Sequence, residues 1–334
     1  MAKIVFYELE DWEKDYIKER LPGYELVFYN EHLDSKSLKT AKDVDAIGIF
    51  IYSEITPEVI ASIPNLKLVA TMSTGYDHIN LNETKKKNIT VCNVPSYGEN
   101  TVAEHTFALI LALSKKIIES AERAKKGDFS LDGLRGFDLK GKTIGIIGTG
   151  KIGKHVVRIA KGFEMNILAY DAYPDNNFAQ QNGFKYVGLD ELLSNSDVIT
   201  LHAPYMESTH HMININNIGK IKKGAILINT ARGGLVETNA IIEALKQGII
   251  SAAGLDVLEE ECFIREEKQL LSNVYKATCD LNVVLQEHML MSQDNVIITP
   301  HNAFNTKEAL QRILDTTIDN IKKFFEGNAV NVVK

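Results

Sequence analysis

The sequence has few cysteines, and their spacing fits neither a disulfide framework nor a metal site. Cys92, Cys262 and Cys279 are its three cysteines, and no two of them form a Cys-x-x-Cys pair. An odd number of widely spaced cysteines argues for a reducing compartment and against a disulfide-stabilised protein. We therefore expect a cytoplasmic protein without a structural metal ion.

The sequence also lacks a long apolar run and a concentration of positive charge. Its longest apolar stretch, residues 107–114, is far shorter than the roughly 20 residues that span a bilayer. The first ten residues are too charged for a signal peptide. With a net charge of −7 and only short lysine runs, the chain offers no basic stripe for a phosphate backbone. We expect neither a membrane nor a nucleic acid as partner.

What the sequence does contain is a regular alternation of β-branched runs and amphipathic segments. Its 334 residues, 45% of them hydrophobic, suggest about two domains with cores of their own. Helices are expected after Thr56, over about 100–126 and over 306–325. Such alternation predicts an α/β protein with doubly wound parallel sheets. The expected strands cover residues 3–9, 24–30, 46–52, 66–72, 89–94, 142–148, 166–171, 196–204, 224–231, 252–257 and 295–300.

A glycine-rich turn follows one of these strands. Gly148, Gly150 and Gly153 form Gly-x-Gly-x-x-Gly, with a helical pattern directly behind. The first glycine permits a tight turn, the second lets the backbone approach a pyrophosphate, and the third lets helix and strand pack closely. The next strand ends in Asp171, 18 residues beyond Gly153, where an acid binds ribose hydroxyls and repels a 2′-phosphate. No arginine follows Asp171, so the pattern predicts NAD rather than NADP.

Polar side chains stand at the ends of three later strands. Arg232 follows residues 224–231, Asp256 ends the next strand with Glu261 five residues later, and His301 follows the last strand. Taken singly, each could be purely structural: Arg232 as a surface cation, Glu261 as a loop acid and His301 as a cap. Together they suit a 2-oxo acid, because arginine binds a carboxylate bidentately and histidine donates a proton to a carbonyl. A nearby carboxylate would keep that imidazole protonated and oriented.

These residues carry a resemblance to a known family. The segments GTGKIG, INTARGGLV, GLDVLEEE and ITPHNAF, with STGYDHIN and VPSYGENTVAEHTFALIL upstream, resemble the D-isomer-specific 2-hydroxyacid dehydrogenases, most closely the D-lactate branch. The resemblance implies a flavodoxin-like substrate domain of residues 1–99 and 301–334, with an NAD-binding Rossmann domain, residues 100–300, inserted into it. It also implies an active-site cleft between the domains and a homodimer formed mainly through the coenzyme domain.

The resemblance assigns roles to individual positions. Arg232 would bind the substrate, His301 would be the acid/base and Glu261 its partner, and Thr74, Gly75 and Tyr97 would also bind the substrate. Asp256 would hold the nicotinamide carboxamide. The full set expected to bind the coenzyme is Val102, Gly148, Gly150, Lys151, Ile152, Gly153, Asp171, His202, Ala203, Pro204, Thr209, Thr230, Ala231, Arg232, Asp256, His301 and Ala303.

Two departures leave the substrate open. The D-lactate enzymes usually read His-x-Ala-Tyr-Tyr after the catalytic histidine, whereas this chain has Phe304 and Asn305. Pyruvate is the expected substrate, with 2-oxoisocaproate, phenylpyruvate, hydroxypyruvate and glyoxylate as alternatives.

Residues 262–294 are irregular, and Cys262 is either redox-sensitive or a bystander. An NAD-sensing, co-repressor-like binding protein is the alternative from another class, and NADH-dependent dimerisation without turnover would indicate it.

The remaining histidines are expected to be structural. His105 lies on the expected long helix and His78 in the turn after residues 73–76. His210 and His211 are adjacent, and without a third ligand in view we expect a loop-to-helix junction there rather than a metal site.

Overall fold

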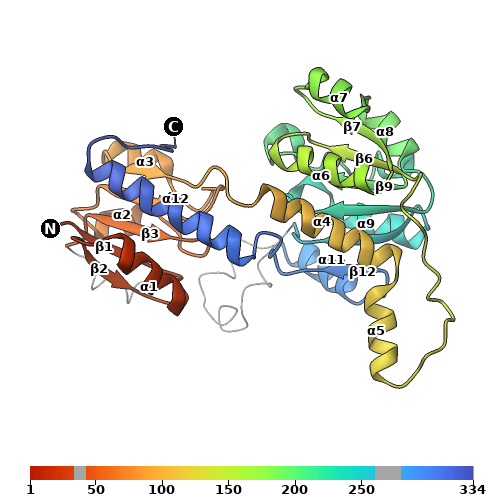
Figure 1. Cartoon of the computed structure of the whole chain (residues 1–334), viewed down its shortest axis with the longest axis horizontal. Coiled ribbons are helices and arrows are strands. Elements are labelled where there is room, and N and C mark those ends of the chain that lie inside the picture. Colours follow the sequence, from red (N-terminus) through yellow and green to blue (C-terminus); the bar gives the residue numbers. More distant parts are fainter. Residues whose placement is uncertain (34–42, 260–279, 334) are drawn as a thin grey trace. The chain divides into compact units, whose positions relative to one another are not determined.

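The computed structural model describes residues 1–33, 43–259 and 280–333. The chain separates into two compact units, Met1–Gly98 with Thr306–Lys334, and Glu99–Asn305. Each unit is a parallel sheet with helices on both faces (Figure 1). Within the described ranges, no helix is long and apolar enough to cross a membrane.

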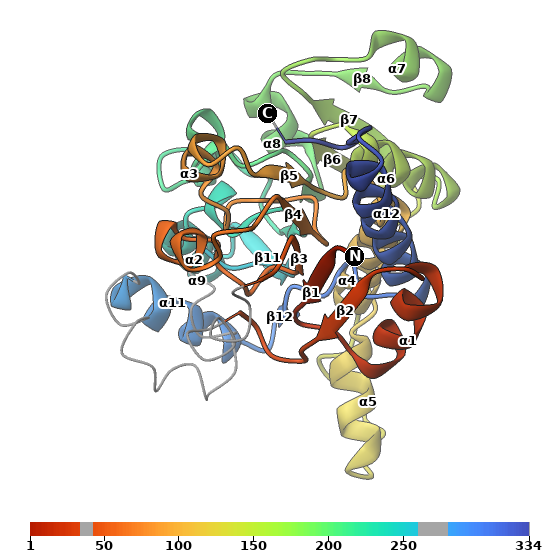
Figure 2. The ribbon, with the colours of Figure 1, turned by 90° about the vertical axis from the view of Figure 1, so that its left-hand side faces the viewer.

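The first unit holds a five-stranded sheet of order β2-β1-β3-β4-β5, the flavodoxin-like order. Every residue of β3 and β4 is buried, as expected of strands covered on both faces. Figure 2 shows α2 and α3 on one face of this sheet and α1 and α12 on the other. Thr56 caps α2 as expected, accepting the Val59 N–H. The bounds are β1 (Lys3–Phe6), α1 (Asp11–Arg20), β2 (Glu25–Phe28), β3 (Ala46–Ile49), α2 (Pro57–Ser62), β4 (Leu68–Thr71), α3 (Leu81–Lys86), β5 (Thr90–Cys92) and α12 (Lys307–Phe325).

The second unit holds a seven-stranded sheet of order β12-β11-β10-β9-β6-β7-β8. This is the Rossmann order with one further strand, β12, beyond β11. The strands are β6 (Thr143–Ile147), β7 (Asn166–Tyr170), β8 (Lys185–Tyr186), β9 (Val198–Leu201), β10 (Ala225–Asn229), β11 (Ile250–Leu255) and β12 (Val296–Ile298).

Two apolar clusters cover the two faces of this sheet. One joins α4 and α6 to one face, with Phe107 and Ile110 packed near Val156 and Val157. The other joins α8, α9 and α11 to the opposite face. The helices are α4 (Glu99–Ser114), α5 (Ile117–Lys125), α6 (Lys151–Gly162), α7 (Asn176–Asn182), α8 (Leu189–Asn195), α9 (Thr238–Lys246) and α11 (Leu281–Met291), and the short 3₁₀ turns are η2 (Glu207–Thr209), η3 (Ile218–Lys220) and η4 (Gly233–Leu235).

All the expected strands are present, and the fold class is confirmed. The single helix expected over 100–126 is wrong, because α4 ends at Ser114 and α5 begins after Lys116, whose φ is 55°. The Ser114 carbonyl accepts the Phe137 N–H at 2.9 Å instead of continuing the helix. Gly136 makes this approach possible, since a Cβ there would clash with that carbonyl oxygen. The short strand β8 was not predicted, because two residues carry no period-2 signal.

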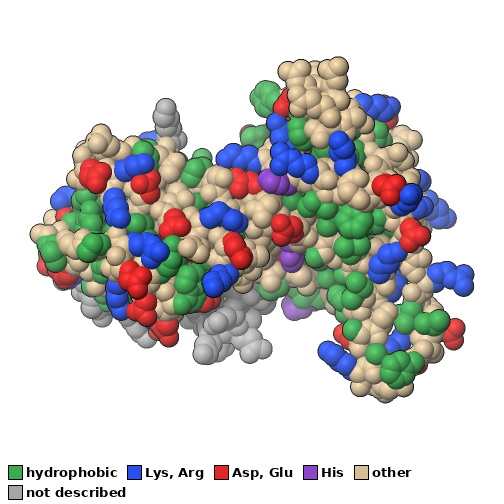
Figure 3. Space-filling view, viewed as in Figure 1, with side chains coloured by type: hydrophobic (Ala, Val, Ile, Leu, Met, Phe, Trp, Pro, Cys, Tyr) green, Lys and Arg blue, Asp and Glu red, His purple; other side chains and the backbone are tan. Residues whose placement is uncertain are grey.

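On the face of the first unit that carries α1 and α12, acidic and basic side chains are interspersed (Figure 3). Surface ion pairs such as Lys18–Asp15, with 3.3 Å between Nζ and Oδ1, join some of them. Pairs of this kind contribute little to stability and favour solubility.

Candidate functional site

The glycine-rich turn has the geometry of an anion cradle. Gly148 has a φ of 91°, which favours glycine, and a Cβ on Gly153 would clash with the Gly148 carbonyl oxygen. Gly150 is the N-cap of α6, and a Cβ there would meet nothing within 4 Å. The first turn of α6 carries no acidic side chain, so the helix N-terminus stays attractive to an anion. Gly148 and Gly153 thus allow the tight turn and the close packing that the sequence predicts, and Gly150 leaves open space at the start of the helix.

This turn lies at the switch point of the sheet, where the strand order reverses between β6 and β9. A Cβ on Gly148 would lie 2.6 Å from the carbonyl carbon of His202, the first residue after β9. Burial lowers the pKa of His202 to about 3, so its ring is neutral. Nε2 bonds the Thr200 hydroxyl at 2.9 Å, and the buried Nδ1 has no partner within the described chain. A buried polar atom that lacks a hydrogen-bond partner beside an anion cradle is consistent with a dinucleotide binding there and supplying that partner.

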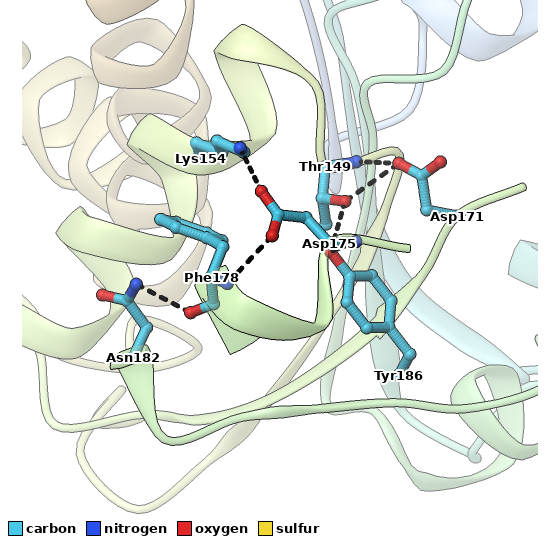
Figure 4. Close-up of polar contacts among 7 residues, drawn as sticks. All are labelled: Thr149, Lys154, Asp171, Asp175, Phe178, Asn182 and Tyr186. Atoms are coloured by element: carbon cyan, nitrogen blue, oxygen red, sulfur yellow. Dashed lines mark hydrogen bonds and ion pairs between the residues drawn. The ribbon is translucent and has the colours of Figure 1, made fainter. Parts of the chain in front are cut away.

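A hollow of about 450 Å³ opens beside the cradle. Asp171 stands in its wall, accepting the N–H and the hydroxyl of Thr149 through one oxygen at 2.6 and 2.9 Å. Its other oxygen accepts the Tyr173 N–H at 2.8 Å. Figure 4 shows Asp171 and Thr149 joined in this way. A carboxylate has about four acceptor positions, so Asp171 can still receive ribose hydroxyls. The lining residues are Thr149, Gly150, Lys151, Lys154, Asp171, Tyr173 and Asp175.

Arg232 extends from the carboxyl end of β10 with an exposed side chain. Asn229, buried at the end of the strand, donates from Nδ2 to the Arg232 carbonyl at 2.8 Å and accepts the Ala231 N–H at 3.1 Å. The next two glycines allow close packing: a Cβ on Gly233 would clash with the Leu258 backbone, and one on Gly234 would lie 2.6 Å from the Tyr205 ring. The chain is thereby held so that the guanidinium remains outside the core.

His301 has a φ of 51°, the left-handed region that is uncommon for residues other than glycine. Its N–H donates to the Asp256 carbonyl at 2.9 Å. The Asp256 carboxylate accepts the Asn302 and Ala303 N–H groups at 3.0 and 2.9 Å and the Thr299 hydroxyl at 2.5 Å. Asp256 is only 1% exposed, so it organises the loop that carries His301.

Helix α4 contributes polar groups to the same strand edge. His105 Nε2 lies 3.1 Å from the Thr299 hydroxyl and 3.5 Å from Asp256 Oδ1. The hydroxyls of Thr106 and Thr230 lie 3.0 Å apart, and Thr106 also donates to the Val102 carbonyl at 2.9 Å. Thr106 thereby contacts both Val102 on its own helix and Thr230 after β10.

The paired histidines belong to a network that sequence reasoning missed. His211 Nε2 lies 2.5 Å from Glu259 Oε1, and the other Glu259 oxygen accepts the Thr238 N–H at 3.0 Å and its hydroxyl at 2.8 Å. The His210 Nδ1 shares a hydrogen bond of 3.0 Å with the Tyr205 hydroxyl. Within the described ranges no group of three metal-ligating side chains is present. This network joins the segment after β9 to the segment after β11.

Other predicted coenzyme residues lie around the same edge. Thr209 donates from its hydroxyl to the Pro204 carbonyl at 2.8 Å. Lys151 begins α6 and lies 3.6 Å from a Glu99 oxygen, and Ile152 is half-buried behind it. Ala203, Ala231 and Ala303 follow β9, β10 and β12. Glu261, Cys262 and Cys279 lie outside the residues that the structure describes.

In the first unit, the loop after β4 is held by its own side chains. Thr74 donates to the Val94 carbonyl at 2.7 Å, and Ser73 donates to the Gly75 carbonyl at 2.6 Å. The N–H groups of Thr74 and Gly75 have no acceptor in the described part of the chain. Two neighbouring N–H donors at the carboxyl edge of a sheet are the groups from which anion-binding loops are built.

Tyr97 and Tyr52 also belong to the first unit. The Tyr97 carbonyl accepts Arg312 Nε at 2.5 Å, which ties the segment before α4 to α12. Tyr52 is 40% exposed, and its N–H donates to the Glu8 carboxylate at 2.7 Å. Sequence reasoning missed Glu8, a half-buried acid after β1 that also accepts the Phe50 N–H and the Ser53 hydroxyl. Burial raises the pKa of Glu8 above the ordinary value. The signal was a single acid within the strand expected over residues 3–9.

The Rossmann sheet, the glycine cradle at its switch point and the acid after its second strand define a dinucleotide-binding protein. The model of the D-isomer specific 2-hydroxyacid dehydrogenase NAD-binding domain matches residues 107–303. The chain belongs to this family of NAD-dependent oxidoreductases, and its cofactor is NAD.

Three similar proteins illustrate the relationship. The D-lactate dehydrogenase of Escherichia coli is 35% identical over 332 residues, 97% of each chain. The glyoxylate reductase of Pyrococcus furiosus is 34% identical over 328 residues, 96% of this chain and 87% of the relative. The crystal structure of D-lactate dehydrogenase from Aquifex aeolicus, complexed with NAD and lactic acid, superposes with a TM-score of 0.84 at 38% identity, covering 97% and 96% of the two chains.

Proposed function

We propose that the protein reduces pyruvate to D-lactate: pyruvate, NADH and a proton give D-lactate and NAD⁺. The observation that supports this best is the placement of Arg232 and His301. They follow β10 and β12, which flank β11 in the sheet, and Asp256 at the end of β11 holds the loop of His301. An anchoring cation and a proton donor thus stand at one edge of an NAD-binding sheet.

The proposed mechanism gives each residue one task. Arg232 binds the carboxylate and carbonyl oxygens of the oxo acid with its forked N–H groups. NADH, when bound, supplies the hydride to C2. Protonated His301 donates its proton to the carbonyl oxygen as charge develops there.

Further residues complete the proposed site. The free N–H groups of Thr74 and Gly75 are proposed donors to the substrate carboxylate, with Tyr97 as a further contact. Glu261 is proposed as the carboxylate partner of His301. For the coenzyme, Gly148, Gly150 and Gly153 would receive the pyrophosphate, Asp171 the ribose hydroxyls, and His202 Nδ1 would gain a partner near the adenosine half.

An assay of the purified protein with NADH and a set of 2-oxo acids tests the proposal. Pyruvate is expected to give the highest kcat/KM among pyruvate, glyoxylate, hydroxypyruvate, phenylpyruvate and 2-oxoisocaproate. A clear preference for one of the others would reassign the substrate within the family. Absence of NADH oxidation with all of them would contradict the proposal, and NADH-dependent dimerisation without turnover would favour the NAD-sensing alternative.

Replacing the proposed acid tests the mechanism separately. His301→Ala is expected to lower kcat by orders of magnitude while NADH affinity, measured by fluorescence titration, changes little. In the reverse direction the wild-type protein should oxidise D-lactate and leave L-lactate unreacted. Unchanged turnover in His301→Ala would remove this residue from the mechanism.

A homodimer in the cytoplasm is part of the proposal. Helix α5 buries no residue, and the loop after it exposes Phe129 and Leu131 by 80% and 82%. Ile117 and Ile118 on α5 are 52% and 42% exposed. An apolar surface of this kind is typical of an interface. Sedimentation should give twice the mass of the chain, and the double variant Phe129→Asp and Leu131→Asp should sediment as a monomer; a wild-type monomer would refute the dimer.

A further inference from the structure

The hollow beside the cradle contains an ion pair that the family pattern does not require. Lys154, in the first turns of α6, places Nζ 2.6 Å from Asp175 Oδ2. Both side chains line the hollow together with Asp171, and each is a little more than a third exposed. Figure 4 shows Lys154 and Asp175 pointing toward each other, with Asp171 on the far side of Thr149. The hydrogen bond from Lys154 lowers the pKa of Asp175, which is therefore ionised.

This ion pair bears on coenzyme choice. A 2′-phosphate carries nearly two negative charges at neutral pH, and proteins that accept NADPH offer it a cation. Lys154 is one of the two cations in the wall of the hollow, and Asp175 neutralises it. The other, Lys151, lies 3.6 Å from a Glu99 oxygen. Asp171 thus repels the phosphate while Asp175 withholds a cation that would attract it.

We propose that Asp175, through its ion pair with Lys154, is a second determinant of the preference for NADH over NADPH. The inference deepens the proposed function, since it rests on coenzyme binding at this hollow. It does not depend on which 2-oxo acid is reduced.

The position of Asp175 is set by the surrounding structure. Its carboxylate accepts the Phe178 N–H at 3.0 Å as the N-cap of α7. Its own N–H donates to the Tyr186 hydroxyl at 3.2 Å, and that hydroxyl lies 2.8 Å from the Thr149 hydroxyl. Lys154 Nζ also lies 4.9 Å from the centre of the Phe178 ring, a cation–π contact. Contacts with Tyr186 of β8 and Phe178 of α7 thus hold the two side chains of the ion pair in place.

The test is a fluorescence titration of NADH and NADPH against a cycle of variants. Asp175→Asn removes the charge and keeps an N-cap residue, so folding is preserved. NADPH should bind this variant about tenfold more tightly than wild type, because one repulsion is lost and one cation is released. NADH affinity should change by less than about twofold, and the NADPH gain should shrink as salt is raised.

Lys154→Gln distinguishes the ion pair from simple repulsion. Alone it leaves the Asp175 charge unpaired and should weaken NADPH binding, and combined with Asp175→Asn it should abolish the gain. Asp190→Asn, whose partner Lys220 lies 2.7 Å away elsewhere in the unit, is the matched control and should alter neither affinity. Unchanged NADPH affinity in Asp175→Asn, or a gain that persists in the double variant, would overturn the inference. Failure of pyruvate turnover alone would refute the proposed function and leave this test intact.

Discussion

The backbone carbonyl of Asp256 accepts the N–H of His301 at 2.9 Å. The link joins the end of β11 to the residue after β12 that has left-handed backbone geometry. Since the Asp256 carboxylate also receives the next two N–H groups, one buried acid holds His301 in an otherwise unfavourable conformation. Asp256 is therefore a positioning residue for the proposed proton donor, whether or not it also contacts the nicotinamide.

Asp256→Asn should lower kcat at least tenfold. An asparagine side chain has one acceptor oxygen, so its NH₂ group would face a donor that the carboxylate now satisfies. The loop would then lose the geometry that presents His301. Steady-state kinetics with pyruvate, together with thermal unfolding, measures the effect. Asp197→Asn is the control, because Asp197 also accepts a backbone N–H, that of Thr143 at 2.9 Å, and lies outside the proposed site. Equal loss in both variants would contradict the prediction.

Arg232→Lys should raise the KM for pyruvate at least tenfold and lower kcat as well. Lysine keeps the charge and loses the forked pair of donors that matches a carboxylate. The exposed Arg158 on α6 provides the control, since Arg158→Lys should leave both constants unchanged. Wild-type kinetics in Arg232→Lys would show that the guanidinium geometry is not used.

The glycines of the cradle should separate folding from coenzyme binding. Gly150→Ala places a methyl group in open space, so the protein should fold while NADH binds at least tenfold more weakly. Gly153→Ala places it against the Gly148 carbonyl oxygen and should destabilise the second unit. Gly162→Ala, at the end of α6 with no neighbour within 4 Å, should bind NADH as wild type does. Fluorescence titration and thermal unfolding of the three variants decide between these outcomes.

Glu13 makes stability in the first unit depend on pH. Its side chain is 8% exposed in α1, and burial raises its pKa from 4.5 to about 7. The folded protein therefore holds this proton more tightly than the unfolded chain does. Stability is unaffected below pH 4.5 and is lost as pH rises toward 7.

Glu13→Gln should therefore stabilise the protein by about 1–3 kcal/mol at about pH 8 and leave it unchanged at about pH 4. The amide oxygen can still accept the Glu10 N–H that Glu13 now accepts at 2.7 Å. Urea unfolding at the two pH values measures the difference. Equal stabilisation at both would rule out the ionisation of Glu13 as the cause.

Local patterns determined much of this protein. Strands covered on both faces are continuous apolar runs, so β3, β4 and β10 can be predicted from the sequence alone. The Gly148–Gly153 turn and Asp171 can also be predicted from the sequence, since tight turns and strand-end acids depend on neighbouring residues. The carboxyl ends of parallel strands share one edge, which predicts that Arg232, Asp256 and His301 lie along it.

Tertiary structure alone decided the features that depend on distant partners. The break between α4 and α5 requires Gly136, which lies against the Ser114 carbonyl only in the folded chain. From the sequence, Asp256 is expected to bind the nicotinamide carboxamide. Only the folded structure shows that both of its carboxylate oxygens accept hydrogen bonds from the segment after β12. Lys154 and Asp175 are 21 residues apart, and neither has a local pattern that predicts a pair. Hydrogen bonds and ion pairs act over a few ångströms, so their partners are chosen by packing rather than by sequence spacing.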